Sequence, residues 1–388
     1  MKTIYLDNNA TSAVAPEVIE AMMPFLRDQW GNPSSMHAFG GQVKKPIDQA
    51  RQQVAALIHA DPSEIVFTSC GTESDNMAIR GAAEAAGTRY NVVTTRVEHP
   101  AVLGPCRYLG ERGHRLHEIA VDSAGQLDLV RLGEALRDGP SVTSVMWANN
   151  ETGVIFPIPE ITAMVKASGG VMHTDAVQVM GKMPIDVRKV PVDLLSMSGH
   201  KLHAPKGIGV LYIRKGTRLQ PFMLGGHQEE SRRAGTENVP YIVGLGKAAE
   251  LAAKSLDKEI AEVAVLRDRL EAGLLATCPD ARVNGDRMQR LPNTLNISFE
   301  YIEGESILYM MSDVGIAASS GSACTSGSLE PSHVLRAMGV PFTAVHGSVR
   351  FSLSRYTTAE EIDYTLKQLP PIIGRLRDIS PFVKKSKI

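Results

Sequence analysis

Asp175 and Lys201 are residues of the types that together carry out chemistry on an aldehyde cofactor. Asp175 follows one apolar strand pattern, and Lys201 ends the run 198–201 (SGHK) directly after another. Side chains at the carboxyl ends of strands in an open α/β sheet point into one crevice. A lysine there can form a Schiff base with an aldehyde, and a carboxylate can keep a pyridinium nitrogen protonated. Pyridoxal phosphate (PLP) requires both groups, so the pair predicts a site for this cofactor.

Each residue also has a plainer interpretation when it is taken alone. Asp175 could cap the helix that follows it, and an isolated lysine such as Lys201 is most often a solvated side chain. Gln178, three residues after Asp175, carries no signal by itself. The prediction therefore rests on the combination of residue types and on their placement after two strands.

A cofactor phosphate needs hydrogen-bond donors, and residues 69–72 (SCGT) are placed to supply them. They lie between a strand pattern and a helix pattern, so the backbone N–H groups of Gly71 and Thr72 are expected at a helix N-terminus, which attracts anions. The same residues also fit a capping box that needs no ligand. Ser198 and His200, beside the predicted cofactor lysine, could add further donors.

Three further polar residues occur where strands end or are buried. His99 follows a strand and precedes Pro100, so it could stack on a planar cofactor and shuttle protons. A histidine at such a junction is more often structural. Asn150 ends another strand and could bond cofactor or substrate oxygens. Arg350 lies in a predicted internal strand and needs an anionic partner, either a substrate α-carboxylate or a structural acidic residue.

The thiol of Cys324 stands in the run 317–328 (AASSGSACTSGS), which contains only small residues. Glycine and serine impose little on the backbone, so this run predicts a thiol on a flexible tether that carries a sulfur atom. The other cysteines, Cys70, Cys106 and Cys278, form no CxxC pair and no disulfide framework. A rival interpretation, a non-catalytic metal or cluster scaffold, predicts clustered Cys and His residues, which the sequence lacks. No role is predicted for Cys70.

The order of elements is that of an α/β protein. Short apolar runs alternate with helical patterns, which favours a layered domain with a largely parallel sheet. Strands are expected at 64–68, 91–95, 142–148, 170–174, 193–197 and 208–213, and helices at 72–86, 127–137 and 158–167. A long helix follows, because apolar residues recur at helical spacing from Ala252 to Leu274. A C-terminal α+β unit is expected to have strands at 294–299 and 348–353 and helices at 305–313 and 359–369.

The composition is that of an ordinary globular protein. Its 388 residues suit about two domains, and 43% are hydrophobic and 21% charged. The net charge of −1 provides no bulk attraction to nucleic acid or to an anionic membrane. The sequence has no signal-peptide pattern and no membrane-spanning run, so a cytoplasmic location with reduced thiols is expected.

Seven motifs make the sequence similar to a known family. They lie at 71–76 (GTESDN), 98–99 (EH), 149–153 (NNETG), 175–178 (DAVQ), 198–201 (SGHK), 233–238 (RAGTEN) and 320–324 (SGSAC). With them the chain resembles the cysteine desulfurases, in the class V branch of the fold-type-I PLP enzymes, over the whole range 5–355. It looks most like the NifS-type members, which supply sulfur for nitrogenase iron–sulfur clusters.

The resemblance implies an α/β fold-type-I architecture with two domains. The large PLP-binding domain would span 16–255 and contain a mostly parallel seven-stranded sheet. The small α+β domain would span 256–388 and carry the mobile Cys324 loop, with an N-terminal segment at 1–15 packed against it. The family also forms homodimers, so a homodimer is expected.

The resemblance assigns the cofactor contacts to Gly71, Thr72, His99, Asn150, Asp175, Gln178, Ser198, His200, Lys201 and, from a second subunit, Thr236. Within this set, Lys201 would hold PLP, Asp175 would pair with the pyridine nitrogen, and Gln178 would bond the ring hydroxyl. Asn150 and Arg350 would bind the substrate. Lys201, His99 and Cys324 would be the catalytic residues.

The implied reaction removes sulfur from L-cysteine, and leaves L-alanine and a persulfide on Cys324 for delivery to an iron–sulfur scaffold protein. Lys201 would move the substrate α-proton, and His99 would be the base that favours the Cys324 thiolate. No intrinsic metal is implied, although Cys324 could serve as a transient iron–sulfur ligand. The alternatives are a selenocysteine lyase or another class V PLP enzyme such as an aminotransferase. An aminotransferase has no use for Cys324, whereas selenocysteine is chemically close to cysteine.

Overall fold

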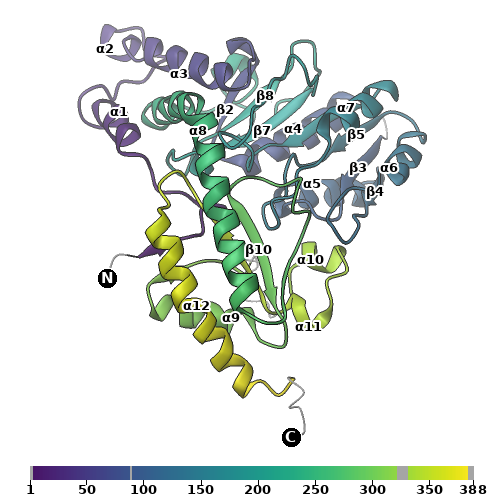
Figure 1. The fold of residues 1–388 in the computed structure, drawn as a ribbon. Helices are drawn as coiled ribbons and strands as arrows, with labels where there is room; N and C mark the ends of the chain where they lie inside the picture. The colour runs from purple at the N-terminus through teal and green to yellow at the C-terminus, as the bar shows by residue number, and fades with distance from the viewer. Residues whose placement is uncertain (1–2, 88–89, 321–330, 383–388) are drawn as a thin grey trace, which may run out of the picture.

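The computed structural model describes residues 3–87, 90–320 and 331–382 (Figure 1). Cys324 therefore lies outside the described residues. A large α/β unit is joined to a smaller unit by one long helix, α8 (Val239–Thr277). Neither this helix nor any other in the described ranges is long and apolar enough to cross a membrane. The predicted fold class is confirmed, including the seven-stranded sheet.

The large sheet has the strand order β2-β8-β7-β6-β5-β3-β4. Neighbouring strands are parallel except that β8 runs antiparallel to both β2 and β7. The bounds are β2 (Ile65–Thr68), β3 (Asn91–Thr95), β4 (Arg115–Ile119), β5 (Ser141–Ser144), β6 (Val171–Asp175), β7 (Leu194–Ser198) and β8 (Gly209–Ile213). As a result, β2, β3, β5, β6 and β7 all end at the same edge of the sheet.

Helices cover both faces of this sheet because its strands carry apolar side chains on both sides. On β2, Ile65 and Phe67 belong to one core, and Val66 belongs to the other. The first core is closed by α1 (Pro16–Arg27), α3 (Lys44–Leu57), α6 (Leu129–Leu136), α7 (Ile158–Ala167) and the start of α8. The second is closed by α4 (Gly71–Ala85) and α5 (Pro100–Glu111). Strands buried on both faces have continuous apolar sequences, which explains why these were predictable.

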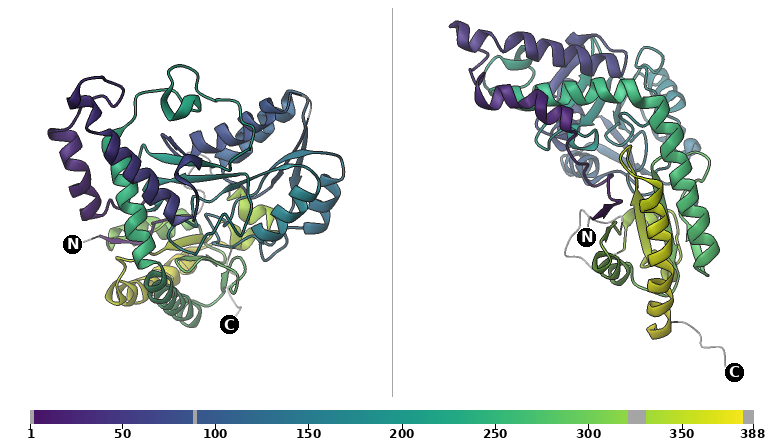
Figure 2. Two further views of the ribbon diagram at one scale, coloured as in Figure 1. Left: turned by 90° about the horizontal axis from the view of Figure 1, so that it is seen from above. Right: turned by 60° about the vertical axis from the view of Figure 1, so that its left-hand side comes forward.

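The smaller unit is built on an antiparallel sheet with the order β12 (Ser348–Ser352), β10 (Thr294–Phe299) and β9 (Ala281–Val283). Helix α12 (Ala359–Ile379) runs beside the second half of α8 (Figure 2), and α9 (Gly304–Asp313) completes its core. The N-terminal strand β1 (Ile4–Tyr5) pairs with β11 (Ile316–Ala317), and Leu6 lies in the same core. The short helices and turns are α2 (Ala38–Gly41), α10 (His333–Ala337), α11 (Phe342–Val345), η1 (Pro62–Glu64), η2 (Gly199–Lys201) and η3 (Gln228–Ser231).

Two helices are longer than the sequence predicted. Helix α8 begins at Val239 and runs unbroken past residue 255, where the domain boundary was predicted. Helix α12 continues through Pro370 and Pro371, although a proline inside a helix removes a hydrogen bond and usually ends it. Ile372, Ile373 and Leu376, which follow the prolines, are buried in the core of the smaller unit. Tertiary packing therefore sustains the helix where the local signal predicts its end.

Candidate active site

The carboxyl edge of the large sheet brings residues that are distant in sequence around one cavity of about 380 Å³. Strands β2, β3, β5, β6 and β7 end at this edge, and residues at or just after each strand end line the cavity. Strand β12 of the smaller unit adds one more residue. Most of the predicted site residues line this cavity: Gly71, Thr72, His99, Asn150, Asp175, Gln178, Ser198, His200, Lys201 and Arg350.

Among the predicted site residues that the structure describes, Thr236 is the only one that is not brought into the cavity. Thr236 is exposed and does not line it. Cys324 lies outside the described residues, but the chain is anchored at the cavity on both sides of it. Ser319 exchanges backbone hydrogen bonds of 2.6 and 3.2 Å with Arg350, and Nε2 of His333 lies 3.0 Å from the carbonyl oxygen of Glu98.

Lys201 is held in the cavity by the N-terminal segment. Its Nζ donates to the carbonyl oxygens of Asn9 at 2.5 Å and of Ala10 at 2.6 Å. Neither of these two residues was predicted as part of the site. One sequence signal could have pointed to them, the polar run 7–11 (DNNAT) beside the buried Leu6. Polar groups packed against a core need hydrogen-bond partners.

Asp175 places a carboxylate on the cavity wall. It is buried, and among the described residues the backbone N–H of Val177 donates to its Oδ1 at 2.9 Å. Burial raises the pKa of Asp175 to about 6, against the opposing effects of that N–H group and of the charge on Lys201. A buried carboxylate is stabilised by a cationic partner, which a protonated pyridine nitrogen would provide.

A second carboxyl group, that of Asp75 on α4, lines the same cavity. Burial, and then the charge of Asp175, raise the pKa of Asp75 well above its ordinary value. Its Oδ1 lies 3.6 Å from Nε2 of His173, a fully buried ring whose pKa burial lowers to about 3. His173 is therefore neutral near pH 7, and burial together with the charge of Asp175 favours the protonated form of Asp75.

The N-terminus of α4 forms the part of the cavity suited to a phosphate. Gly71 is the first residue of the helix, and a Cβ at this position would lie 3.0 Å from Val177 and 3.4 Å from Ser198. A larger residue would therefore fill the space in front of the first helical N–H groups, which attract anions. Burial and the charge of Lys201 lower the pKa of His200, on the same wall, to about 4. A lysine, a buried carboxylate and this anion cradle together fit PLP.

His99 caps α5 in a way that fixes its tautomer. Its Nδ1 accepts the backbone N–H of Ala101 at 3.1 Å, so the proton of the neutral ring is on Nε2. Burial, followed by the charges of Lys201 and His333, lowers the pKa of His99 to about 4. The ring is therefore neutral near pH 7 and offers a hydrogen-bond donor at Nε2.

Arg350 is 2% exposed and reaches the cavity from β12. Its guanidinium donates to the carbonyl oxygen of Asn150 at 3.0 Å and to Oδ1 of Asp7 at 2.8 Å. Within the described residues, its buried Nε has no hydrogen-bond partner. Leaving a buried donor unpaired costs about 1–3 kcal/mol, which is expected where a bound anion completes the site.

Comparison with known proteins identifies the family. The family model described as "Aminotransferase class-V" matches residues 4–365. The chain is 58% identical over 383 residues to "Cysteine desulfurase NifS" of Azotobacter vinelandii, a match that covers 98% of this chain and 95% of that protein. The solved structure "NIFS-LIKE PROTEIN" matches with a TM-score of 0.91 and 39% identity, over 96% of this chain and 100% of that one. "SspA in complex with cysteine" matches with a TM-score of 0.80 and 33% identity, over 91% and 99%.

These matches extend over nearly the full length of both chains in each pair, and they agree with the cavity described above. The family is PLP-dependent, and the cavity contains the groups that this cofactor needs. The chain therefore belongs to the class V aminotransferase family of PLP-dependent enzymes, and within it to the NifS-type cysteine desulfurases.

Proposed function

We propose that this protein removes sulfur from free L-cysteine to give L-alanine, and that the sulfur first forms a persulfide on Cys324. The observation that carries the proposal is the convergence of Lys201, Asp175 and Arg350 on one cavity beside a helix N-terminus. These groups would hold the cofactor, keep its ring nitrogen protonated and bind an α-carboxylate. The similarity to a cysteine desulfurase and to a protein solved with cysteine favours cysteine as the amino acid.

Arg350 is the group that we assign to the substrate carboxylate. A guanidinium binds a carboxylate best through two parallel N–H donors. The edge of Arg350 formed by Nε and Nη2 offers such a pair. Among the described residues, Nε has no hydrogen-bond partner, and Nη2 donates to Oδ1 of Asp7. The substrate would therefore satisfy Nε and share the second donor with Asp7.

Lys201 is the group that we assign to proton transfer at the substrate α-carbon. When PLP is bound, it supplies an electron sink for the charge that forms at this carbon. Lys201 would hold the cofactor at rest and remove the α-proton after the substrate has replaced it. The carbonyl oxygens of Asn9 and Ala10 keep the free amine inside the cavity, close to the reacting atoms. Asp175 would keep the ring nitrogen protonated throughout.

His99 acts, in this proposal, as a hydrogen-bond donor to sulfur. Its Nδ1 is occupied by the N–H of Ala101, so it could remove a proton only after that cap had opened. The Nε2–H group, by contrast, is the hydrogen-bond donor of the neutral ring that predominates near pH 7. A donor near a sulfur anion favours the thiolate, which is the nucleophilic form.

The sulfur transfer needs no external oxidant. The Cys324 thiolate forms a bond to the substrate sulfur while the carbon–sulfur bond breaks, and the electron pair of that bond stays on carbon. This carbon then takes a proton and becomes the methyl group of alanine. Cys324 is five positions along the chain from Ser319, which is bonded to the backbone of Arg350. An extended chain of five residues spans at most roughly 17 Å, which keeps the thiol within reach of the cavity.

The function is tested by incubating the PLP-loaded protein with L-cysteine and measuring alanine and sulfide. With a reducing thiol present, we expect alanine and sulfide in equal amounts. With no added thiol and one equivalent of L-cysteine, so that no excess substrate thiol reduces the persulfide, we expect one alanine per active site and no free sulfide. Formation of a keto acid instead of alanine would indicate an aminotransferase and contradict the proposal. Turnover of L-selenocysteine with none of L-cysteine would indicate a selenocysteine lyase.

We propose that the acceptor of the persulfide is an iron–sulfur scaffold protein, in keeping with the similarity to NifS-type enzymes. No group of three or more His, Cys, Asp or Glu side chains in the described ranges is placed to hold a metal ion. Cluster assembly would then take place on the partner, with this chain as the sulfur donor. Because the reaction requires free thiols, a cytoplasmic location suits it.

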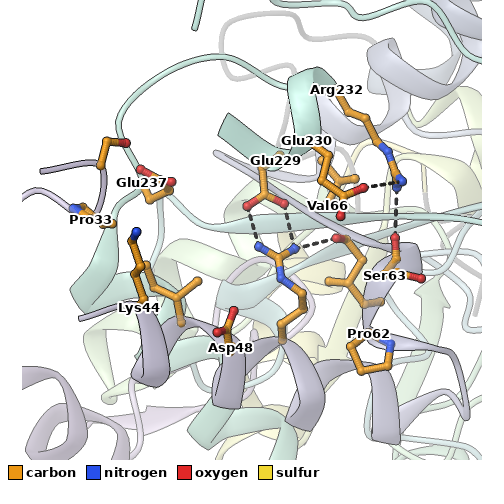
Figure 3. Close-up of a pocket in the computed structure, with 14 residues that line it drawn as sticks. Pro33, Lys44, Asp48, Pro62, Ser63, Val66, Glu229, Glu230, Arg232 and Glu237 are labelled. Atoms are coloured by element: carbon orange, nitrogen blue, oxygen red, sulfur yellow. Dashed lines mark hydrogen bonds and ion pairs between the residues drawn. The ribbon is translucent and has the colours of Figure 1, made fainter. Parts of the chain in front are cut away.

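We also propose that the protein is a homodimer in which Thr236 of one subunit binds the cofactor phosphate of the other. Thr236 is exposed in its own chain. Two ion pairs hold the segment that leads to Thr236: Glu229, labelled in Figure 3, bonds Arg51 at 2.7 and 2.8 Å, and Arg233 bonds Glu73 at 2.7 Å. Large apolar side chains near this surface are exposed, and a second subunit would cover them; they include Trp30, Phe39 and Leu224.

Thr236→Ala should lower the affinity for PLP about tenfold, because it removes one hydrogen bond to a charged group. The equilibrium dissociation constant of PLP is measured from the cofactor absorbance. Sedimentation of the wild-type protein should give a mass twice the chain mass of 41.9 kDa. Thr343→Ala, an exposed threonine on the smaller unit, serves as the control. A monomeric wild-type protein that binds PLP with the same affinity as Thr236→Ala would contradict this assignment.

A further inference from the structure

Lys182 is a buried lysine behind the active-site cavity, and the proposed reaction does not use it. It is 6% exposed, and it lines a second, small cavity together with Lys201, Glu259 and Arg355. Lysine is almost never fully buried unless its charge is paired. The carboxylate of Glu259 lies 3.2 Å from the guanidinium of Arg355, so this acid already has a cationic partner. The position of Lys182 therefore requires another explanation.

Lys182 makes its one hydrogen bond in the described part of the chain to Gln178. Its Nζ donates to Oε1 of this glutamine at 3.3 Å, and Nε2 of the same glutamine donates to the carbonyl oxygen of Asn9 at 3.1 Å. An ammonium group can only donate and a carbonyl oxygen can only accept. While Lys182 is charged, the amide of Gln178 therefore has a single orientation that satisfies both neighbours. Without Lys182, only the contact with Asn9 would fix this orientation.

The orientation of this amide determines what Gln178 offers to the cavity that it lines. Nε2 carries two hydrogens, and one of them is used by Asn9. The carbonyl oxygen of Asn9 also accepts from Lys201. The second hydrogen on Nε2 of Gln178 therefore lies close to the lysine that would hold the cofactor. An N–H donor at this place suits an oxygen acceptor on the cofactor ring, and a flipped amide would present a second acceptor instead.

The charge of Lys182 adds to this effect. The charged and titratable groups around it are Lys201, His200, His203, Glu259, Arg350 and Arg355. Burial, and then the charges of Lys201 and Arg350, lower the pKa of Lys182 to about 7, with Glu259 opposing them. A ring oxygen that becomes negative next to Gln178 would favour the charged form of Lys182, and the charged lysine would in turn favour the negative oxygen.

We propose that Lys182 is a positioning residue of the cofactor site, which fixes the amide of Gln178 with its N–H toward the cofactor ring oxygen and favours the negative charge of that oxygen. This inference rests on the proposed function, because it assumes that PLP occupies the cavity. A purely structural role is the alternative, in which Lys182 serves only to fill the space between the large unit and α8. The two roles differ in their effect on the bound cofactor.

The test is a pH titration of the visible absorbance of the bound cofactor in the holoenzyme, without substrate. A nearby positive charge favours the deprotonated form of the group that joins the cofactor to Lys201. Lys182→Met removes such a charge, so it should raise the midpoint of the absorbance titration by about one pH unit. Lys182→Arg keeps the charge, so its midpoint should stay close to that of the wild type. Lys166→Met removes a lysine that pairs with Asp193 outside this cavity, and should leave the midpoint unchanged.

A second comparison tests whether Lys182 acts through Gln178. In a Gln178→Leu background, adding Lys182→Met should shift the midpoint by much less than in the wild type. A folded Lys182→Met holoenzyme with the wild-type midpoint would overturn the proposal and leave the structural role. If Lys182→Met does not fold, Lys182→Gln keeps a polar group in the small cavity and must show the same upward shift. A wild-type protein that binds PLP but makes no alanine would instead refute the proposed function.

Discussion

Lys201→Ala will abolish the turnover of L-cysteine and leave the protein folded. The substitution removes both the amine that holds the cofactor and the group that moves the α-proton. Proton transfer by a positioned side chain contributes about 10²–10⁴-fold to a reaction rate on its own. Because the cofactor attachment is lost as well, we expect kcat to fall by at least about 10⁴-fold. The measurement is the rate of alanine formation at saturating PLP and L-cysteine, with a thermal melting curve to confirm folding.

The matched control for this prediction is Lys206→Ala. Lys206 is an exposed lysine five positions along the chain, and it does not line the cavity. Its replacement should leave both the rate and the cofactor spectrum unchanged. In the wild type, borohydride reduction followed by mass spectrometry should place the cofactor on the peptide that contains Lys201. A Lys201→Ala variant that retains more than a tenth of the wild-type rate would refute the role assigned here.

Cys324→Ala will retain the bound cofactor but lose sulfur transfer. The cofactor pocket is formed by other residues, so its absorbance and its change on adding L-cysteine should persist. Alanine and sulfide formation should fall by about 10³-fold or more, as when a nucleophile is removed from a catalytic unit. The measurement is single-turnover alanine formation, recorded together with the cofactor spectrum.

Cys70 provides a demanding control for the role of Cys324. It lines the active-site cavity and directly precedes Gly71, whereas Cys106 and Cys278 are buried. If sulfur transfer needed only a thiol in the cavity, Cys70 would support it in the Cys324→Ala variant. We expect Cys70→Ala to keep most of the wild-type rate. Equal losses in the two variants would mean that sulfur transfer is not specific to Cys324.

The location of the cofactor site could be predicted from the sequence because it depends on local patterns and on one topological rule. Strands such as β3 and β6 each contain a short apolar run, and polar residues follow this run directly in the sequence. Parallel strands then bring Asp175 and Lys201 to the same edge without any further information. This is why ranges such as 91–95 and 158–167 were predicted to the residue.

Features that depend on tertiary contacts could not be predicted in this way. The carbonyl oxygens of Asn9 and Ala10 hold Lys201 from about 190 residues away, and no local pattern encodes this contact. The tautomer of His99 depends on a single cap, the N–H of Ala101. The role of Lys182 depends on which side of the Gln178 amide it contacts. Such details are determined by packing between segments, which the sequence records only indirectly.

The most direct test of this account is to find which cysteine gains a sulfur atom. The PLP-loaded protein is treated with L-cysteine in the absence of reducing thiols, trapped with an alkylating reagent, digested and analysed by mass spectrometry. We expect one additional sulfur on the peptide that contains Cys324, and none on those that contain Cys70, Cys106 or Cys278. Alanine formation with the extra sulfur on Cys70, or on no cysteine at all, would contradict it.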